Sequence, residues 1–354
     1  MFCVSIREIP LSQTTSAKTP VIPSGNSEII PILNNSNFED QWEEFSETLF
    51  SRIPLNSQRA LAFDLKDYFA TMARHQLVPL RESVTELAHN VRIYVTDMAG
   101  HRKMANATIR RRISSVRKFF RLKLNLDPVA SSELLRTYIS RELALNSLPP
   151  SQATPARAQH LAVMNATFAE RRLSDLRAKL MMNLAYDTLA RSDELRQLRL
   201  EHINSEPQTN AHSILITNAK NDQEGIGSAR FISQTTYQIL MRYLEQARVQ
   251  NGYIFRKLSK HNSLAMNAGT EPLSYQTMVR DLSKICDFVD FGGRKVTGHS
   301  YRVGAVQDMV VNGYTNSQIA LAGGWSNEAM PAYYARMLRA NESAAADMAR
   351  KLGR

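Results

Sequence analysis

Residues 148–155 of the chain read Leu-Pro-Pro-Ser-Gln-Ala-Thr-Pro, and this stretch interrupts a pattern that is otherwise mostly helical. Each proline lacks a backbone N–H and fixes its own φ, so repeated prolines exclude a helix and favour an extended linker. The chain has 354 residues, which is too long for one ordinary core and sufficient for two domains. We therefore place a linker at residues 149–157, between one domain at residues 37–148 and a second at residues 158–354.

Five segments before the linker carry apolar side chains at intervals of three and four residues. This spacing puts the apolar side chains of each segment on one face of a helix, and helices with one apolar face pack into a bundle. The predicted helices cover residues 38–51, 61–75, 84–99, 105–124 and 134–145. Residues 1–36 are rich in Ser, Thr, Pro and Asn without a period, which indicates a flexible arm.

The segment after the linker has a mixed pattern. Residues 212–217 (His-Ser-Ile-Leu-Ile-Thr) and 228–233 are predicted as two short strands, and the polar stretch between them contains two glycines, which favours a hairpin. Periodic segments predict helices at residues 173–189, 193–200, 235–249, 274–288, 299–312, 316–322 and 342–352. The predicted fold class is therefore mainly α: a helical bundle followed by a mixed, mostly helical domain with a small β-hairpin.

The chain is strongly basic, with 44 Lys and Arg against 33 Asp and Glu and a net charge of +11. Excess positive charge favours a polyanionic partner, of which nucleic acid is the commonest. On charge alone, a basic protein without a DNA partner is about equally consistent with the sequence. The positions of the basic residues decide between the two interpretations.

Several classes of protein are disfavoured by what the sequence lacks. Its two cysteines, Cys3 and Cys286, provide neither a disulfide framework nor a CxxC metal pair. No apolar run reaches the ~18 residues that span a bilayer, and the N-terminus does not resemble a secretory signal. There is no glycine-rich phosphate loop, carboxylate cluster or zinc spacing, so we expect no metal and no other cofactor. These features predict a cytoplasmic protein without a membrane partner.

The most informative motif is Thr-Gly-His-Ser-Tyr-Arg at residues 297–302. His299 and Arg302 are three positions apart at the start of a predicted helix, so their side chains lie on one face. A helix start adds positive potential and free N–H groups, and an imidazole beside a guanidinium suits a phosphate group. The alternative is a capped surface helix with a chance His and Arg, since so short a pattern recurs by accident.

Three further stretches occur in a fixed order around this motif. Residues 186–195 read Tyr-Asp-Thr-Leu-Ala-Arg-Ser-Asp-Glu-Leu, residues 323–325 read Gly-Gly-Trp, and a tyrosine stands at position 334. Here the chain resembles the tyrosine recombinase (phage integrase) family, and its spacings from His299 and Trp325 to Tyr334 are those of the Cre type. The resemblance is strong over about residues 155–354 and rests on the helix pattern alone over residues 37–148.

The resemblance implies a role for each matching residue. Arg191 and Arg302 would clamp the scissile phosphate, whose charge the transition state must stabilise. Tyr334 would be the nucleophile, with His299 assisting as a base, because a phenol with a pKa near ~10 needs help at neutral pH. Trp325 stands where many relatives have His; its indole N–H donates a hydrogen bond but accepts no proton, and the ring also packs.

Three neighbouring residues are assigned less directly. Glu194 matches an acidic position of the family and is expected to orient His299 or Arg191, although a solvated carboxylate in a first helical turn fits nearly as well. Lys220 comes after the first predicted strand, where the family has a lysine that acts as general acid for the leaving 5′-hydroxyl; loop lysines are otherwise usually just solvated. Tyr333 precedes the expected nucleophile, and the spacing selects Tyr334.

Two predicted helices are candidates for DNA contact outside this site. Residues 105–123 contain seven basic and no acidic residues, which favours a helix lying against phosphates or in the major groove over a merely solvated face. The second helix, residues 274–288, precedes the HxxR motif and resembles the family's recognition helix. The candidate DNA-binding residues of the two helices are Arg110, Arg111, Arg117, Lys118, Arg121, Gln276, Arg280 and Lys284.

The resemblance also implies what the whole protein does. A clamp-shaped enzyme would bind a double-stranded DNA recombination site, form a homo-tetramer and exchange strands in two steps without metal or ATP, in association with the nucleoid. The tail helix, within residues 341–354, would dock into a neighbouring protomer, although packing on its own domain is the simpler alternative. The competing functions are a type IB topoisomerase or telomere resolvase with the same chemistry, and a DNA-binding protein without catalytic activity.

Overall fold

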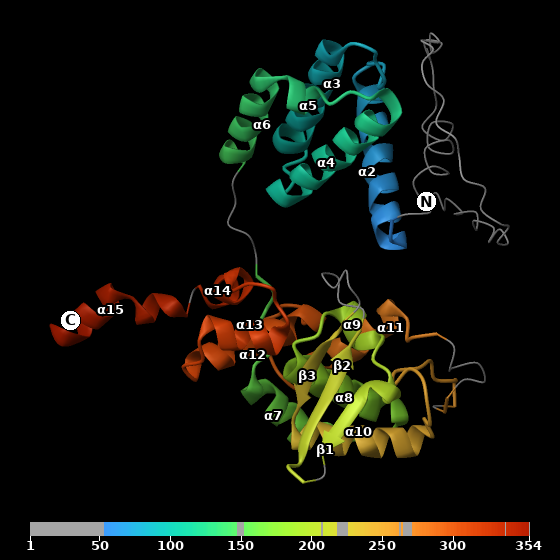
Figure 1. The fold of residues 1–354 in the computed structure, drawn as a ribbon, viewed down its shortest axis with the longest axis vertical. Helices are drawn as coiled ribbons and strands as arrows, with labels where there is room; N and C mark the ends of the chain where they lie inside the picture. The colour runs from blue at the N-terminus through green and yellow to red at the C-terminus, as the bar shows by residue number, and fades with distance from the viewer. Residues whose placement is uncertain are drawn as a thin grey trace. The chain divides into compact units, whose positions relative to one another are not determined.

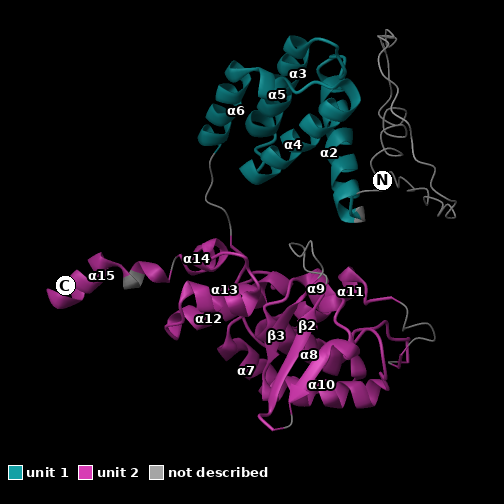
Figure 2. Ribbon diagram, in the orientation of Figure 1, with its two compact units in different colours: residues 1–149 teal, residues 150–354 magenta. Residues whose placement is uncertain are grey.

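The computed structural model describes residues 53–146, 152–206, 208–217, 226–261, 263–264, 271–336 and 338–353. The predicted arm at residues 1–36, the predicted helix at residues 38–51 and Lys220 lie outside these ranges. The chain divides into two compact units, residues 1–149 and residues 150–354 (Figure 2).

The first unit is a bundle of helices around an apolar core (Figure 1). The side chains that the periodic pattern places on one face of each helix are buried, as Leu65, Leu87, Ile109 and Phe120 show. Burial of these stripes, rather than helix propensity, supplies most of the stability of such helices. The elements are α2 (Leu55–Arg74), α3 (Val84–Thr96), the π-helix η2 (Asp97–His101), α4 (Asn106–Leu124), α5 (Pro128–Ser131) and α6 (Glu133–Leu145).

The second unit combines helices with one small antiparallel sheet (Figure 1). The strands lie in the order β1-β2-β3, and His212 of β2 pairs with Ser205 on one side and Ile232 on the other. The strands are β1 (Ile203–Glu206), β2 (Ala211–Ile216) and β3 (Ser228–Ile232). The helices before and beside the sheet are α7 (Ala158–Thr167), α8 (Leu173–Thr188), α9 (Ser192–Arg196), η3 (Leu200–His202) and α10 (Gln234–Ala247). The later helices are α11 (Tyr275–Ser283), η4 (Lys284–Asp287), α12 (Gly298–Val311), α13 (Asn316–Gly323), α14 (Ala329–Ala335), η5 (Arg339–Glu342) and α15 (Ala344–Lys351).

Helix α8 is the centre of this unit. It packs against α10, α11, α12 and β3, and every residue from Leu176 to Ala185 is buried. A helix that is buried all round must satisfy its polar side chains internally. Arg177 does so by pairing with Asp281 of α11 at 2.7 Å, and it also donates a hydrogen bond to the Arg256 carbonyl.

The predicted fold class, mainly α with a small β element, is confirmed by this architecture. Two details differ from the sequence prediction. The sheet has a third strand, β1, whose sequence Ile-Asn-Ser-Glu carries too few β-branched or aromatic residues to be recognised as a strand. The helix predicted at residues 274–288 ends as an α-helix at Ser283 and continues as the 3₁₀ turn η4.

Candidate active site

The start of helix α12 fixes the positions of His299 and Arg302. The helix begins at Gly298, and the backbone N–H of Thr297 donates a hydrogen bond to Ser300 Oγ at 3.1 Å. A Cβ on Gly298 would lie 2.4 Å from Ser192 Oγ, so glycine is needed for the start of α12 to approach the start of α9 this closely. His299 and Arg302 therefore project from the first turn beside the segment that carries Arg191.

Arg302 is held in place before any ligand binds. Its side chain is only 1% exposed, and it donates hydrogen bonds to the carbonyls of Leu189 and, at 3.2 Å, of Gly323. The guanidinium carbon lies 3.9 Å from the centre of the Trp325 ring. Burial, with the nearby charge of Arg191, lowers the pKa of Arg302 to about 10, so the group stays charged at neutral pH. A guanidinium has five N–H groups, so the two hydrogen bonds to carbonyls do not exhaust its donors.

Tyr334 brings its hydroxyl to His299. The tyrosine lies on α14 with 4% of its surface exposed, and its Oη is 3.2 Å from His299 Nε2. The backbone carbonyl of Tyr334 accepts a hydrogen bond from Gln152 Nε2 at 3.1 Å, which ties α14 to residues of the predicted linker. The phenol and the imidazole are thus arranged so that a proton can pass between them.

The two members of this pair have displaced pKa values. Burial lowers the pKa of His299, and the charges of Arg302 and Arg191 lower it further. Burial raises the pKa of Tyr334, while Arg302 and Arg191 oppose part of that increase. At neutral pH the imidazole is therefore neutral and the phenol protonated, which is the state in which His299 can accept the proton of Tyr334.

Arg191 and Glu194 form a second fixed pair at the start of α9. One carboxylate oxygen of Glu194 accepts a hydrogen bond from Arg191 Nη1 at 2.7 Å, and the other accepts one from the Arg191 backbone N–H at 2.8 Å. The Glu194 side chain is buried, whereas the side chain of Arg191 is one-third exposed. Of the two partners expected for Glu194, the structure places it on Arg191, whose side chain is partly exposed.

Trp325 and Tyr333 complete the surroundings of Tyr334. The Trp325 ring lies 5.9 Å from the Tyr334 ring and stacks over Gly323, where a Cβ would come within 1.9 Å of the indole. Tyr333 instead has the guanidinium of Arg336 4.1 Å from its ring centre. Of the two adjacent tyrosines, Tyr334 is the one whose hydroxyl bonds to His299.

The structure also adds a residue that the sequence did not single out. Arg230 of β3 is 3% exposed, and the pKa of Arg302 responds to its charge. The available signal was an arginine two positions from Ile232 in a predicted strand, which puts both residues on one face. The alternation alone does not say whether that face or the one with Phe231 is buried, and the structure exposes Phe231.

Two further sequence predictions concern this site: the role of Lys220 and the absence of a metal ion. Lys220 belongs to the stretch between β2 and β3 and lies outside the described residues, so its general-acid role remains a prediction. Within the described ranges, no cluster of three or more His, Cys, Asp and Glu is placed to hold a metal ion. No helix in that part of the chain is long and apolar enough to cross a membrane.

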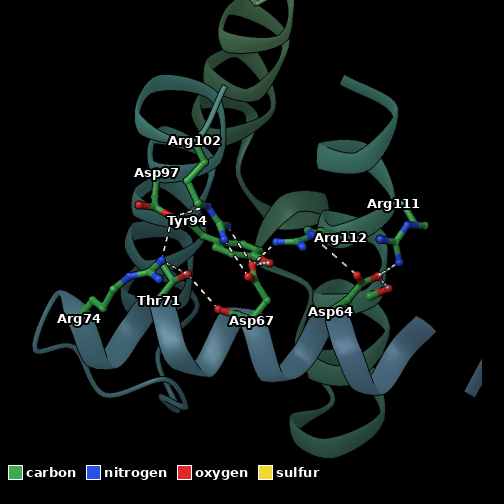
Figure 3. Close-up of polar contacts among 10 residues, drawn as sticks. Asp64, Asp67, Thr71, Arg74, Tyr94, Asp97, Arg102, Arg111 and Arg112 are labelled. Carbon is green, nitrogen blue, oxygen red and sulfur yellow. Dashed lines mark hydrogen bonds and ion pairs between the residues drawn. The ribbon is translucent and has the colours of Figure 1, made fainter. Parts of the chain in front are cut away.

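In the first unit, helix α4 uses several of its basic side chains for internal ion pairs (Figure 3). Arg111 pairs with the buried Asp64 at 2.5 Å, and the buried Arg112 pairs with Asp67. Burial alone would raise the pKa of Asp67, but hydrogen bonds from Arg102 and Tyr94 and the charges of Arg112 and Arg102 lower it to about 2. This network ties α4 to α2.

Other candidates on α4 differ in how far they are engaged. Arg117 holds Asp127 with two nitrogens, and Arg121 reaches the same carboxylate at 4.0 Å. No ion pair within the described residues involves Arg110, which is exposed, or Lys118, which is half-buried. Arg110 and Lys118 are therefore the α4 side chains with most charge available for an external anion.

On α11 the proposed recognition face is shorter than the sequence suggested. Gln276 and Arg280 are both exposed, whereas Met278 and Leu282 of the same helix are buried. Lys284 falls in η4 instead, and its Nζ lies 3.0 Å from Asp175. The 3₁₀ turn changes the direction of the third side chain, so only Gln276 and Arg280 share a regular helical face.

Comparison with solved structures shows which proteins share this fold. XerH recombinase bound to palindromic difH aligns with a TM-score of 0.57 and 14% identity over 86% of this chain and 82% of that one. Lambda integrase (residues 75–356), solved as a dimer bound to a COC′ core site, aligns with a TM-score of 0.57 and 14% identity, over 84% of this chain and 94% of that one. The Tn1549 transposon integrase in complex with transposon right end DNA aligns with a TM-score of 0.56 and 13% identity, over 84% of this chain and 94% of that one.

Sequence comparison narrows the relationship. Recombinase Cre of Escherichia phage P1 is 28% identical in an alignment 177 residues long, which covers 47% of this chain and 51% of Cre, so the match spans about half the length of that relative. The model of the phage integrase family matches residues 157–340, and these include His299, Arg302 and Tyr334. Because this match covers more than half of the 354 residues, the chain belongs to the phage integrase family, the tyrosine recombinases.

Proposed function

We propose that the protein is a site-specific DNA recombinase that cleaves and rejoins strands through a 3′-phosphotyrosyl bond to Tyr334. The observation that carries the proposal is the approach of Tyr334 Oη to His299 Nε2, 3.2 Å apart, next to the fixed guanidinium of Arg302. A nucleophile in contact with a neutral base, beside cations that suit a phosphate, is the arrangement that phosphoryl transfer requires.

In the proposed cleavage step, Arg191 and Arg302 bind the non-bridging oxygens of the scissile phosphate. His299 takes the phenolic proton while the Tyr334 oxygen forms a bond to phosphorus. The bond from phosphorus to the 5′-oxygen breaks, and Lys220 supplies the proton that the leaving 5′-hydroxyl needs. Arg302, His299 and Tyr334 already hold one another and the backbone through hydrogen bonds before substrate arrives, so little reorganisation of these three opposes the reaction.

The proposed second step reverses the first with another strand. A 5′-hydroxyl from the partner duplex attacks the phosphotyrosine, Tyr334 leaves, and the phosphodiester is restored. The number of phosphoester bonds is unchanged throughout, so the exchange requires no ATP, and the cationic side chains carry the charge stabilisation without a metal ion. An enzyme with this activity would work on the nucleoid.

The proposed assembly is a tetramer in which each protomer closes its two units around one half-site as a clamp. The tail helix α15 supports this proposal, because none of its residues is buried and Met348 and Leu352 are 57% and 63% exposed. An eight-residue helix is marginal by itself. Docking of α15 into a neighbouring protomer would bury its apolar side and link the active sites.

The test begins with duplexes that the protein selects from a random pool, which supply its binding site. A nicked version of that site releases a short fragment after cleavage and traps the intermediate. We expect a covalent adduct on denaturing gels, located at Tyr334 by peptide mapping, and recombination between two such sites. Specific binding without an adduct would indicate a DNA-binding protein without catalytic activity. An adduct with relaxation of single plasmids but no exchange would indicate a topoisomerase.

A further inference from the structure

Arg230 lies in the second unit between the sheet and helix α13. From β3, its Nη1 donates to the carbonyl of Ala322 at 3.1 Å and of Leu321 at 3.4 Å, in the last turn of α13. The Leu321 carbonyl also accepts a hydrogen bond from the Gly324 N–H at 3.2 Å. The end of a helix carries partial negative charge, so a guanidinium at this place stabilises it. Arg230 therefore acts as a cap that is supplied by a different element.

The backbone next to α13 is shaped to admit this guanidinium. Gly324 has φ +55°, and a Cβ at this position would lie 1.8 Å from Arg230 Nη2. Any other residue would be both strained and in collision with the arginine. Gly324 and Arg230 thus fit one another, and Trp325 is the next residue in the chain.

The same helix end also holds Arg302. Arg230 binds the carbonyls of Leu321 and Ala322, and Arg302 binds the next one, that of Gly323, at 3.2 Å. The ring of Trp325 packs on Arg302, and Trp325 follows Gly324 directly in the chain. A displacement of this helix end would therefore move two of the groups that orient Arg302.

Arg230 also interacts electrostatically with residues of the candidate active site. Burial lowers its pKa, the charge of Glu194 raises it and that of Arg191 lowers it. Three guanidiniums thus lie within electrostatic reach of one buried carboxylate. Arg230 Nε is buried and has no hydrogen-bond partner among the residues that the structure describes. Burying a charged group usually costs folding free energy, so a contribution to stability alone explains the buried guanidinium of Arg230 poorly.

We propose that Arg230 is a positioning residue for the phosphate site, which holds the end of α13 so that Gly323 and Trp325 fix Arg302 against the scissile phosphate. This inference rests on the proposed strand cleavage. It assigns a function to a residue of β3 that acts through the end of α13 rather than through Tyr334 or His299.

The test compares Arg230→Met with the wild type on the nicked site, using single-turnover cleavage and half-site binding. A misplaced clamp lowers the rate, and displacements of about 1 Å cost up to about 100-fold. We therefore expect a loss of roughly 10- to 100-fold in cleavage rate, with half-site binding changed only about two- to threefold. The control is Arg256→Met, which removes another buried guanidinium; its Nε bonds to the Tyr253 carbonyl at 2.7 Å. It should retain the wild-type cleavage rate below its melting temperature.

A modified substrate separates positioning from a general structural effect. A methylphosphonate at the scissile position removes the charge of one non-bridging oxygen, so a defect in the Arg302 clamp matters less there. The loss in Arg230→Met, like that in Arg302→Ala, should shrink on the methylphosphonate. An equal loss on both substrates, or a normal rate in a folded Arg230→Met, would overturn the proposal. Wild-type protein that forms no adduct would instead refute the proposed function.

A second pair of variants keeps the inference testable if Arg230→Met does not fold. Gly324→Ala places a methyl group against an intact Arg230 and should displace it, with a loss of cleavage rate. An Arg230→Lys background keeps the positive charge but lacks the forked guanidinium that the methyl group meets, so Gly324→Ala should have a much smaller additional effect there. Equal effects of Gly324→Ala in both backgrounds would show that the two residues act independently and would overturn the inference.

Discussion

Tyr334 Oη and His299 Nε2 lie 3.2 Å apart, and their environment determines which of the two groups carries the proton between them. Burial lowers the pKa of His299 and raises that of Tyr334, so the proton rests on the phenol before DNA binds. In the proposed reaction, this state would stay unreactive until a scissile phosphate lies beside the arginines. The side chains are therefore already in position, while the proposed nucleophile, Tyr334, is still protonated.

At the scale of single residues, we predict that Tyr334→Phe binds the DNA site as tightly as the wild type and forms no covalent adduct. The ring keeps its packing against Trp325, and only the hydroxyl is lost. Tyr333→Phe is the matched control, because Tyr333 packs against Arg336 and should not supply the nucleophile. Adduct formation by Tyr334→Phe that disappears in Tyr333→Phe would reverse the assignment, and denaturing gels with peptide mapping measure it.

A second prediction concerns the pH dependence of cleavage. His299 must be neutral to accept a proton, and its pKa in the free protein is below its ordinary value of 6.5. The rate measured at protein concentrations below Kd reports the free protein, so it should stay level as the pH falls to 6.5 and decline only below that. The raised pKa of Tyr334 keeps the phenol protonated throughout this range.

The measurement is the single-turnover rate between about pH 5 and about pH 8, the range in which a histidine titrates, with half-site binding monitored in parallel. His299→Ala should be slower and should lose the acidic limb of the profile. A decline that begins above about pH 7, or an identical limb in His299→Ala, would assign the titration to another group.

At the scale of elements, the sequence predicted those features that depend on local pattern. The start of α12 and the choice of Tyr334 depend on short spacings, and the structure places His299 and Tyr334 in contact. Arg230 was missed because a strand's period of two gives two faces without saying which is buried. The pairing of Arg111 with Asp64 was missed because 47 residues separate the partners, and only the packed bundle brings them together.

The ion pairs of α4 lead to a third prediction, which separates its outer from its inner basic residues. Arg110→Ala and Lys118→Ala should weaken DNA binding at every sequence, and each should reduce the slope of log K against log salt by about one if its side chain contacts a phosphate. Neither should change the thermal stability, because no internal ion pair is lost. The measurement is half-site affinity from about 50 to 200 mM salt.

The control for that prediction is Arg112→Met on the same helix. Arg112 is buried and pairs with Asp67, so its loss should destabilise the first unit by about 1–3 kcal/mol. The salt slope of the remaining folded protein should stay unchanged. A reduced slope in Arg112→Met, or unchanged slopes in both surface variants, would show that a different face of α4 meets the DNA.

At the scale of the whole molecule, each unit has its own core and the two present different chemistry. The first unit offers basic helix faces, whereas the candidate catalytic residues that the structure describes all belong to the second. An enzyme that exchanges strands must bring several active sites together, so one protomer with one tyrosine is insufficient for the proposed reaction. A link between protomers is therefore part of the proposed function and would require a surface that the single chain leaves exposed.

Helix α15 is our candidate for that surface, and the final prediction concerns its removal. Deleting residues 341–354 takes away a helix with no buried residue, so the second unit should keep its thermal stability. One protomer should still bind a half-site with nearly normal affinity, while cooperative binding to a full site, assembly of two sites and recombination should all decline. Met348→Asp within the full-length chain is a milder test, since it places a charge on the exposed apolar side without shortening the protein. Native gels with half-site and full-site DNA, alongside a recombination assay, measure these effects. If both altered proteins assemble and recombine like the wild type, α15 does not join the protomers; if the deletion melts at a much lower temperature, the helix packs on its own domain.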